Sequence, residues 1–428
     1  MAGTSVIDSG DYDLQIATGF IVNGFVLDDP IAGILDSPYV LDGDSEFASI
    51  MKGTTSITVK RGREDIGDAF SSGTMIFTIY DTYGVFNPFD TSSPFYDTAL
   101  SKPGLAPMRQ VKLMRYDSLG AEEMIFDGIV VNYDYNFALG GIDTVTVYCA
   151  DQFYLLSQTS LDELTVSAET SGERIETILD LPEVDFSVAS RDIATGTVNL
   201  GHSSHYTIPA GTNTLNYITQ INQTAEFGRV FMSRDGVFTF QERIGQTLSN
   251  PVLRFDDQGN HLPMSGLGIS FEADQVINRT VITGLNGNTA TDTDAASIAT
   301  YFIQTTSISD SLLHEQTEIN EAAAYLLNGE PEARYTSVET AFLMLDTAGR
   351  DDVAVIEIGD TIEISKSFPS GTGTSQLTQQ LSVEGIEHRI NVRDGHRVTL
   401  FTAPTTIVYQ LILDDPVYGT LDSFNVLG

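Results

Sequence analysis

The sequence has no tryptophan and only one cysteine, Cys149, among its 428 residues. A single cysteine cannot form a disulfide within the chain, so no internal cross-link stabilises the fold. Cys149 lies in the strand-like run TVTVYCAD, and free cysteines in such runs behave as small apolar side chains. We therefore expect its thiol to be buried.

Basic residues are scarce, because 21 Lys and Arg stand against 59 Asp and Glu, which gives a formal net charge of −38. This charge repels nucleic-acid phosphates and anionic lipid headgroups. Long apolar runs are missing too: no stretch approaches the length of a membrane span, and the start MAGTSVIDSGDYD lacks the basic and apolar regions of a signal peptide. We expect no stable nucleic-acid binding, no membrane insertion by this chain and synthesis in the cytoplasm.

The residues that are present favour a mainly β protein. Apolar residues make up 41% and charged residues 19% of the chain, a balance typical of globular proteins. Glycine is abundant, with 37 copies, and β-branched residues dominate the apolar set, as in strands and turns. The length suffices for two to four domains.

Changes in periodicity divide the chain into six segments. Runs such as TSITVKRG, GTMIFTIYD and EMIFDGIVVNYDYNF alternate apolar and polar residues, which predicts strands, whereas GERIETILDLP and TNTLNYITQINQTAEFG have helical spacing. DVAVIEIGDTIEISK, QLSVEGIEHRINV and HRVTLFTA alternate again. The segments are an extended arm (1–48), a small β domain (49–157), two α+β modules (158–250 and 251–340), a second β domain (341–404) and a C-terminal arm (405–428).

A short phrase occurs near both ends of the chain. LDDPIAGILDSPYVL at 27–41 returns as LDDPVYGTLDSFNVL at 413–427, with ten of fifteen positions identical. Each copy combines a proline-stiffened turn with apolar arms, so it is either a surface hairpin or a docking element. The residues expected to dock a partner are Leu27, Asp28, Asp29, Pro30, Gly33, Leu35 and Asp36, with their counterparts Leu413, Asp414, Asp415, Pro416, Gly419, Leu421 and Asp422.

The order of several motifs resembles a known family. A strand leads to the loop Phe86-Asn87-Pro88, then to an exit strand with Phe126-Asp127-Gly128, then to a helix that starts at Ala150-Asp151. The segment LNYITQINQTAEFGRVFMSRDGVFTFQER and the later SVEGIEHRI continue the same order. Over roughly residues 50 to 402 the sequence is similar to minor tail proteins of long-tailed bacteriophages, the baseplate or tail-tip hub proteins.

This resemblance implies a structural role in the virion. It implies two β-barrel-like hub domains that flank mixed modules and form a trimeric ring at the tail tip, part of the DNA exit conduit. The implied partners are two further copies of the chain, the distal tail protein, the tape measure protein and other minor tail proteins. The Asp-Asp-Pro phrase is also similar to one near the ends of neighbouring tail proteins. The acidity suggests either a channel lining that repels DNA or a charge that serves only solubility.

The sequence carries no recognisable catalytic or cofactor signature. It lacks the Gly-x-Ser-x-Gly, His-Glu-x-x-His and phosphate-loop patterns, and we expect no catalytic residue, no metal and no cofactor. His202 and His205 could share a metal only within a turn-rich loop that offers no cysteine. The alternative is a glycan-binding or glycan-degrading tail protein, since two carboxylates need no fixed spacing, but the absent tryptophan disfavours it.

Overall fold

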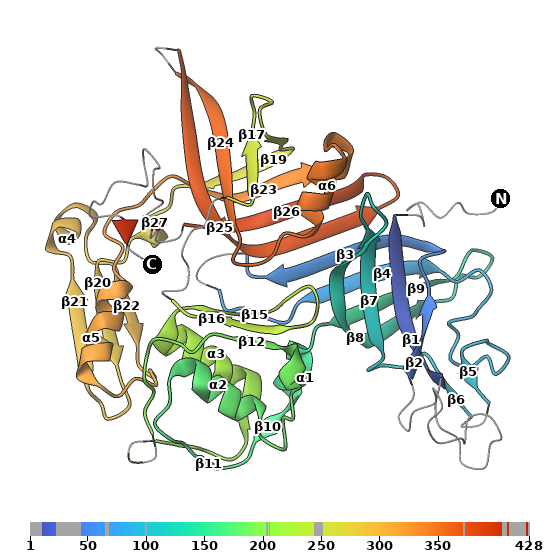
Figure 1. Cartoon of the computed structure of the whole chain (residues 1–428), viewed down its shortest axis with the longest axis horizontal. Coiled ribbons are helices and arrows are strands. Elements are labelled where there is room, and N and C mark those ends of the chain that lie inside the picture. The colour runs from blue at the N-terminus through green and yellow to red at the C-terminus, as the bar shows by residue number, and fades with distance from the viewer. Residues whose placement is uncertain are drawn as a thin grey trace.

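The computed structural model describes most of the chain. The described residues are 11–22, 44–64, 68–98, 101–202, 204, 206–243, 251–370, 373–404, 409–410 and 425–426. As expected from the sequence, these residues are mainly β with smaller α+β parts (Figure 1). None of the described helices has both the length and the apolar character of a membrane span.

The first β body is an antiparallel sheet of seven strands in the order β3-β4-β9-β8-β7-β1-β2. Alternate side chains enter one core because successive residues of a strand face opposite sides, and in β4 Met75, Phe77 and Ile79 are buried. The strands are β1 (Tyr12–Val22), β2 (Asp44–Ser49), β3 (Thr54–Gly62), β4 (Thr74–Tyr80), β7 (Gln110–Tyr116), β8 (Glu122–Asn136) and β9 (Thr144–Ala150), with a short ribbon of β5 (Tyr96–Asp97) and β6 (Lys102–Pro103) between β4 and β7.

The segment expected as an extended arm, residues 1–48, contributes to this sheet. β1 pairs with β7 and β2 pairs with β1, and Leu14 and Ile16 of β1 are fully buried in the first core. The alternating run YDLQIA places these apolar side chains on one face. Burial of that face is why residues 12–22 pack within the body.

The second β body follows the order β18-β17-β24-β25-β26-β23-β19. Its strands come from both sides of the expected boundary at residue 340, so part of the segment 251–340 packs with the final β segment. The elements are β17 (Leu253–Asp256), β18 (Leu262–Pro263), β19 (Gly266–Ser270), β23 (Arg334–Ala341), β24 (Thr361–Ser370), β25 (Gly373–Asn391) and β26 (Gly395–Ala403), with the turn η4 (Phe342–Met344) and the helix α6 (Thr347–Ala354).

The helix α6 was not expected from the sequence. The run DVAVIEIGDTIEISK alternates and predicted a strand from residue 352, but β24 begins only at Thr361. Asp346 caps the helix by accepting a hydrogen bond from the Gly349 backbone N–H at 2.8 Å. Val353 and Ala354 are buried in the second core, so tertiary packing overrides a short alternating pattern.

The mixed parts of the chain share one hydrophobic core, although the sequence suggested two modules. Ile218 and Phe238 from the first part and Ile282 and Ile319 from the second all lie in it. We call this unit the mixed body. Its main elements are α1 (Phe153–Gln158), α2 (Ser171–Leu179), α3 (Thr214–Ile221), η2 (Asn222–Glu226), β12 (Arg191–Ile193), β15 (Arg229–Met232), β16 (Phe238–Gln241), β20 (Arg279–Thr283), β21 (Thr289–Thr293), α4 (Ala295–Tyr301), β22 (Thr305–Ile308) and α5 (Gln316–Tyr325).

The remaining described elements are single turns or two-residue strands. They are β10 (Ser160–Leu161), β11 (Leu164–Thr165), η1 (Val188–Ser190), β13 (Thr207–Ile208), β14 (Thr212–Asn213), η3 (Ala273–Gln275), β27 (Tyr409–Gln410) and β28 (Asn425–Val426). In Figure 1 the mixed body lies below and beside the two β bodies, which meet where β3 runs next to β25.

Candidate functional site

The two β bodies are joined edge to edge through β3 and β25. β25 is 19 residues long. Its first half pairs with β24 and its second half pairs antiparallel with β3, from Gly385 opposite Gly62 to Asn391 opposite Ser56. One long strand therefore belongs to both bodies, and we call the region around it the junction.

Two glycines allow strands β3 and β25 to approach closely at the start of this pairing. A Cβ atom on Gly62 would lie 2.2 Å from the carbonyl oxygen of Glu384, and one on Gly385 would lie 2.3 Å from the carbonyl oxygen of Arg63. Gly62 also has a φ of +81°, which disfavours any residue with a Cβ. The crossing of β3 onto β25 thus depends on glycine at both positions.

Glu384 connects all three bodies at the junction. This carboxylate of β25 is 3% exposed. It accepts hydrogen bonds from Arg63, which follows β3, at 3.0 and 2.7 Å, and from Arg229 of β15 at 2.9 and 2.7 Å. Burial acts to raise the pKa of Glu384, but the guanidinium groups of Arg229 and Arg63 outweigh it and hold the pKa below its ordinary value.

A second ion pair crosses the same three bodies. Arg61 of β3, whose side chain is 2% exposed, contacts Glu357 at 2.5 Å. The other carboxylate oxygen of Glu357 accepts a hydrogen bond from the Arg234 backbone N–H at 2.9 Å, in the β15–β16 turn. Because buried charges are costly unless they are paired, each broken pair would leave an uncompensated charge inside the protein.

β1 also contacts the second β body. The Tyr12 hydroxyl is hydrogen-bonded to His396 Nδ1 at 2.8 Å, and His396 Nε2 is hydrogen-bonded to His388 Nδ1 at 3.0 Å. Burial lowers the pKa of His388 to about 3 and that of His396 well below its ordinary value. Both rings are therefore neutral near pH 7.

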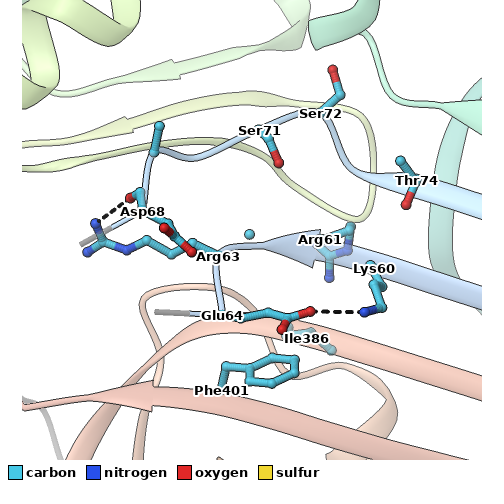
Figure 2. Close-up of a pocket in the computed structure, with 12 residues that line it drawn as sticks. Lys60, Arg61, Arg63, Glu64, Asp68, Ser71, Ser72, Thr74, Ile386 and Phe401 are labelled. Atoms are coloured by element: carbon cyan, nitrogen blue, oxygen red, sulfur yellow. Dashed lines mark hydrogen bonds and ion pairs between the residues drawn. The ribbon is translucent and has the colours of Figure 1, made fainter. Parts of the chain in front are cut away.

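A polar cleft opens along the junction (Figure 2). It encloses about 430 Å³ between β3, the segment 68–74 and the strands β25 and β26. Lys60 contacts Glu64 at 2.9 Å, and Arg63 donates a hydrogen bond to the backbone carbonyl of Asp68 at 3.2 Å. The cations of this cleft thus have partners within the chain. The geometry of the cleft supports a structural role in joining the two β bodies.

Within the described residues, no group of three or more His, Cys, Asp or Glu is arranged to hold a metal ion. The fourteen residues expected to dock a partner, between 27 and 36 and between 413 and 422, lie outside the described residues. The thiol of Cys149 is buried, as expected, and burial raises its pKa above the ordinary value.

The sequence analysis did not identify the junction residues. Glu384 and Arg61 each lie inside a strand run whose neighbours are buried, as in LSVEGIEHRI. A charged residue on the apolar side of a strand is the signal that could have marked them, because such residues are seldom buried without a partner. The sequence alone does not say which partner each one has.

The fold therefore defines a class of protein with two β bodies that share a strand and rest on one mixed body. No protein-family model matches this chain, and no curated protein is significantly similar to it in sequence. Solved structures with a similar fold include three tail proteins, two of which come from prophages.

A tail protein from Neisseria meningitidis MC58 superposes with a TM-score of 0.57 and 11% identity, covering 93% of this chain and 98% of that one. The 43 kDa tail protein of prophage MuSo2 from Shewanella oneidensis gives 0.54 and 12% identity, with 92% and 97% covered. Prophage tail protein gp18 from Listeria monocytogenes EGD-e gives 0.50 and 12% identity, with 92% and 95% covered. The chain thus has the fold of prophage tail proteins over nearly its whole length, which confirms the resemblance at the level of fold.

Proposed function

We propose that this protein is a structural component of a phage tail, the hub at the tail tip or baseplate. The observation that carries the proposal is the junction, which fixes two β bodies side by side in a fold shared with tail proteins along nearly the whole chain. A tail tube has sixfold symmetry, and three copies with two β bodies each present six similar units to it. The role is one of assembly and conduit, not catalysis.

In this proposal the ring connects the tail tube to the distal proteins of the tip, and DNA leaves through it. Its partners are two further copies, the distal tail protein, the tape measure protein and other minor tail proteins. A net charge of −38 keeps a polyanion from adhering to the wall over a Debye length of about 8 Å in physiological salt.

The ring is tested by the mass and position of the protein. Mass photometry of the complex released from tails should give about 140 kDa, three times the 46.5 kDa of the chain, and a tail reconstruction should place threefold density for it at the tip. A monomeric or sixfold arrangement in intact tails would contradict the ring.

The two Asp-Asp-Pro segments are proposed to seat the ends of the chain on neighbouring subunits or tail proteins. Each segment combines apolar anchors with a proline that limits the conformations of the free chain. Burial of four such anchors would contribute about 1.5–3 kcal/mol each before the cost of ordering.

A further inference from the structure

The chain leaves the second β body beside the end of β19. Ser337 of β23 pairs with Phe401 of β26 on one side and with Gly268 of β19 on the other, so β26 and β19 lie about 10 Å apart, two strand spacings. β19 ends at Ser270 and β26 ends at Ala403, each two residues after this pairing. The C-terminal residues therefore start at the corner where β19 passes into the mixed body.

Exposed apolar side chains gather around this corner and the start of β20. Five of them are between 44% and 82% exposed, and we call them the strip: Ile269, Phe271, Phe302, Ile303 and Tyr325. A single exposed apolar residue is common in soluble proteins. Several around one connection between two bodies form a patch of the kind that another segment covers.

Backbone contacts place the members of the strip along one connection. Ile277, which leads into β20, exchanges backbone hydrogen bonds of 2.9 and 2.8 Å with Asn328, three residues after Tyr325. The side-chain amide of the buried Asn278 donates a hydrogen bond to the Phe302 carbonyl at 2.7 Å. The segment 269–279 therefore passes both the end of α4 and the end of α5, which carry the rest of the strip.

The exposed charges near the strip are mainly acidic. One exposed cation, Arg279, stands against four exposed acids on the same connections, namely Glu272, Asp274, Glu330 and Glu332. Like charges repel at short range, so these acids disfavour an acidic occupant such as the Asp-Asp-Pro segment itself. An uncharged apolar segment fits the strip better.

The chain supplies such a segment directly after the corner. Residues 405–413, TTIVYQLIL, contain no charged residue and six apolar ones; we call them the apolar run. Nine extended residues span about 30 Å, which is three times the distance between β26 and β19. β27, at Tyr409–Gln410, belongs to the run, and Figure 1 draws it on the side of the molecule that carries α4 and β20.

We propose that the apolar run docks on the strip of its own chain. Apolar side chains then leave water on both surfaces, and no charge of the run lies beside the acids. The docked run fixes the base of the C-terminal arm, so that the second Asp-Asp-Pro segment, which starts at Leu413, extends from an anchored point towards a neighbour. This last step rests on the proposed docking of that segment, whereas the contact between run and strip does not.

The reactivity of cysteines placed in the strip tests the contact. Phe271→Cys and Ile303→Cys are each compared in the full chain, in a chain that ends at residue 413 and in a chain that ends at residue 404. Maleimide should label both positions about fivefold or more slowly in the two longer chains than in the shortest, because a covered thiol reacts only when the contact opens. Leu139→Cys, fully exposed on the first β body, should react equally in all three, and the native Cys149 is buried.

A charge in the apolar run provides the second test. Leu411→Asp in the full chain should raise the labelling rate at position 303 to that of the chain ending at residue 404, because an unpaired carboxylate is costly to bury. Leu411→Met is the matched control and should keep the slow rate. Both substitutions lie outside the three bodies, so they leave the folding of the bodies intact.

Equal labelling in the three chains would overturn the contact. Fast labelling in the chain that ends at residue 413 would also overturn it, since the Asp-Asp-Pro segment and not the run would then cover the strip. Protection that grows with protein concentration would assign the cover to a second copy. All of these rates are measured on the purified chain, so their failure leaves the hub proposal intact, and failure of the hub in tail reconstructions leaves the contact intact.

Discussion

At the scale of single residues, the buried charges at the junction contribute more to the stability of the fold than the many acids on the surface. Glu384 contacts two arginines from two other bodies, whereas the pair of Arg397 and Glu339 has side chains 41% and 29% exposed. Solvent screens an exposed pair, and a buried pair leaves an uncompensated charge when one partner is lost. An ion pair therefore affects stability more at the buried junction than on the exposed surface.

We expect Glu384→Gln to lower the free energy of unfolding by about 3 kcal/mol or more, because Arg63 and Arg229 would remain buried without a full countercharge. Denaturant unfolding measures this difference. Glu339→Gln is the control and should cost less than about 1 kcal/mol. Equal effects of the two substitutions would show that the junction pair contributes no more than a surface pair.

The buried histidines predict a dependence of stability on pH. Burial lowers the pKa values of His388 and His396 in the folded state, so the unfolded chain binds more protons below about pH 6.5 and stability falls as the pH falls. Asp151 has the opposite effect on stability. Burial raises its pKa to about 7, so its folded state binds a proton that the unfolded chain releases, and this contribution to stability rises as the pH falls.

His388→Gln should therefore reduce the slope of unfolding free energy against pH between about pH 4 and 6, by up to about 1.4 kcal/mol per pH unit. Unfolding in denaturant at several pH values gives this slope, whatever the absolute stability of the variant. An unaltered slope in His388→Gln would contradict the assignment.

At the scale of elements, the junction depends on how closely β3 can approach β25. We expect Gly62→Ala to cost more than about 2 kcal/mol, because it combines a positive φ with a contact of 2.2 Å to the Glu384 carbonyl oxygen. Gly395→Ala separates the two causes: Gly395 has a φ of +71° but nothing within 4 Å of a Cβ. It should cost about 1 kcal/mol by thermal or denaturant unfolding, and equal losses would rule out the close approach as the cause.

At the scale of the whole molecule, we expect the three bodies to fold without the C-terminal segment, which serves assembly instead. Removal of residues 411–428 should leave the unfolding transition of the three bodies unchanged and block completion of the tail tip. Asp415→Ala with Pro416→Ala should weaken assembly less, since the apolar anchors remain while the turn loosens. Electron microscopy of tails and phage titre measure the outcome, and infectious tails at normal yield from the truncated protein would refute the proposed docking.

The sequence by itself determined the features that depend on neighbouring residues. Alternation predicted β3, β4, β8 and β26, and helical spacing predicted α2 and α3. The order of these elements led to the tail-protein resemblance that the superposed structures confirm at the level of fold. These features follow from side-chain periodicity and turn chemistry, which are local properties.

Only the tertiary structure decided which distant segments share a core. Ile282 and Phe238 lie in one core, residues 253–270 join the sheet of residues 334–403, and Glu384 pairs with Arg63 and Arg229. Hydrophobic burial has no direction, and a charge does not specify its partner along the chain. Apolar periodicity therefore fixes which face of a strand is buried, but only the packing of the folded chain selects what covers that face.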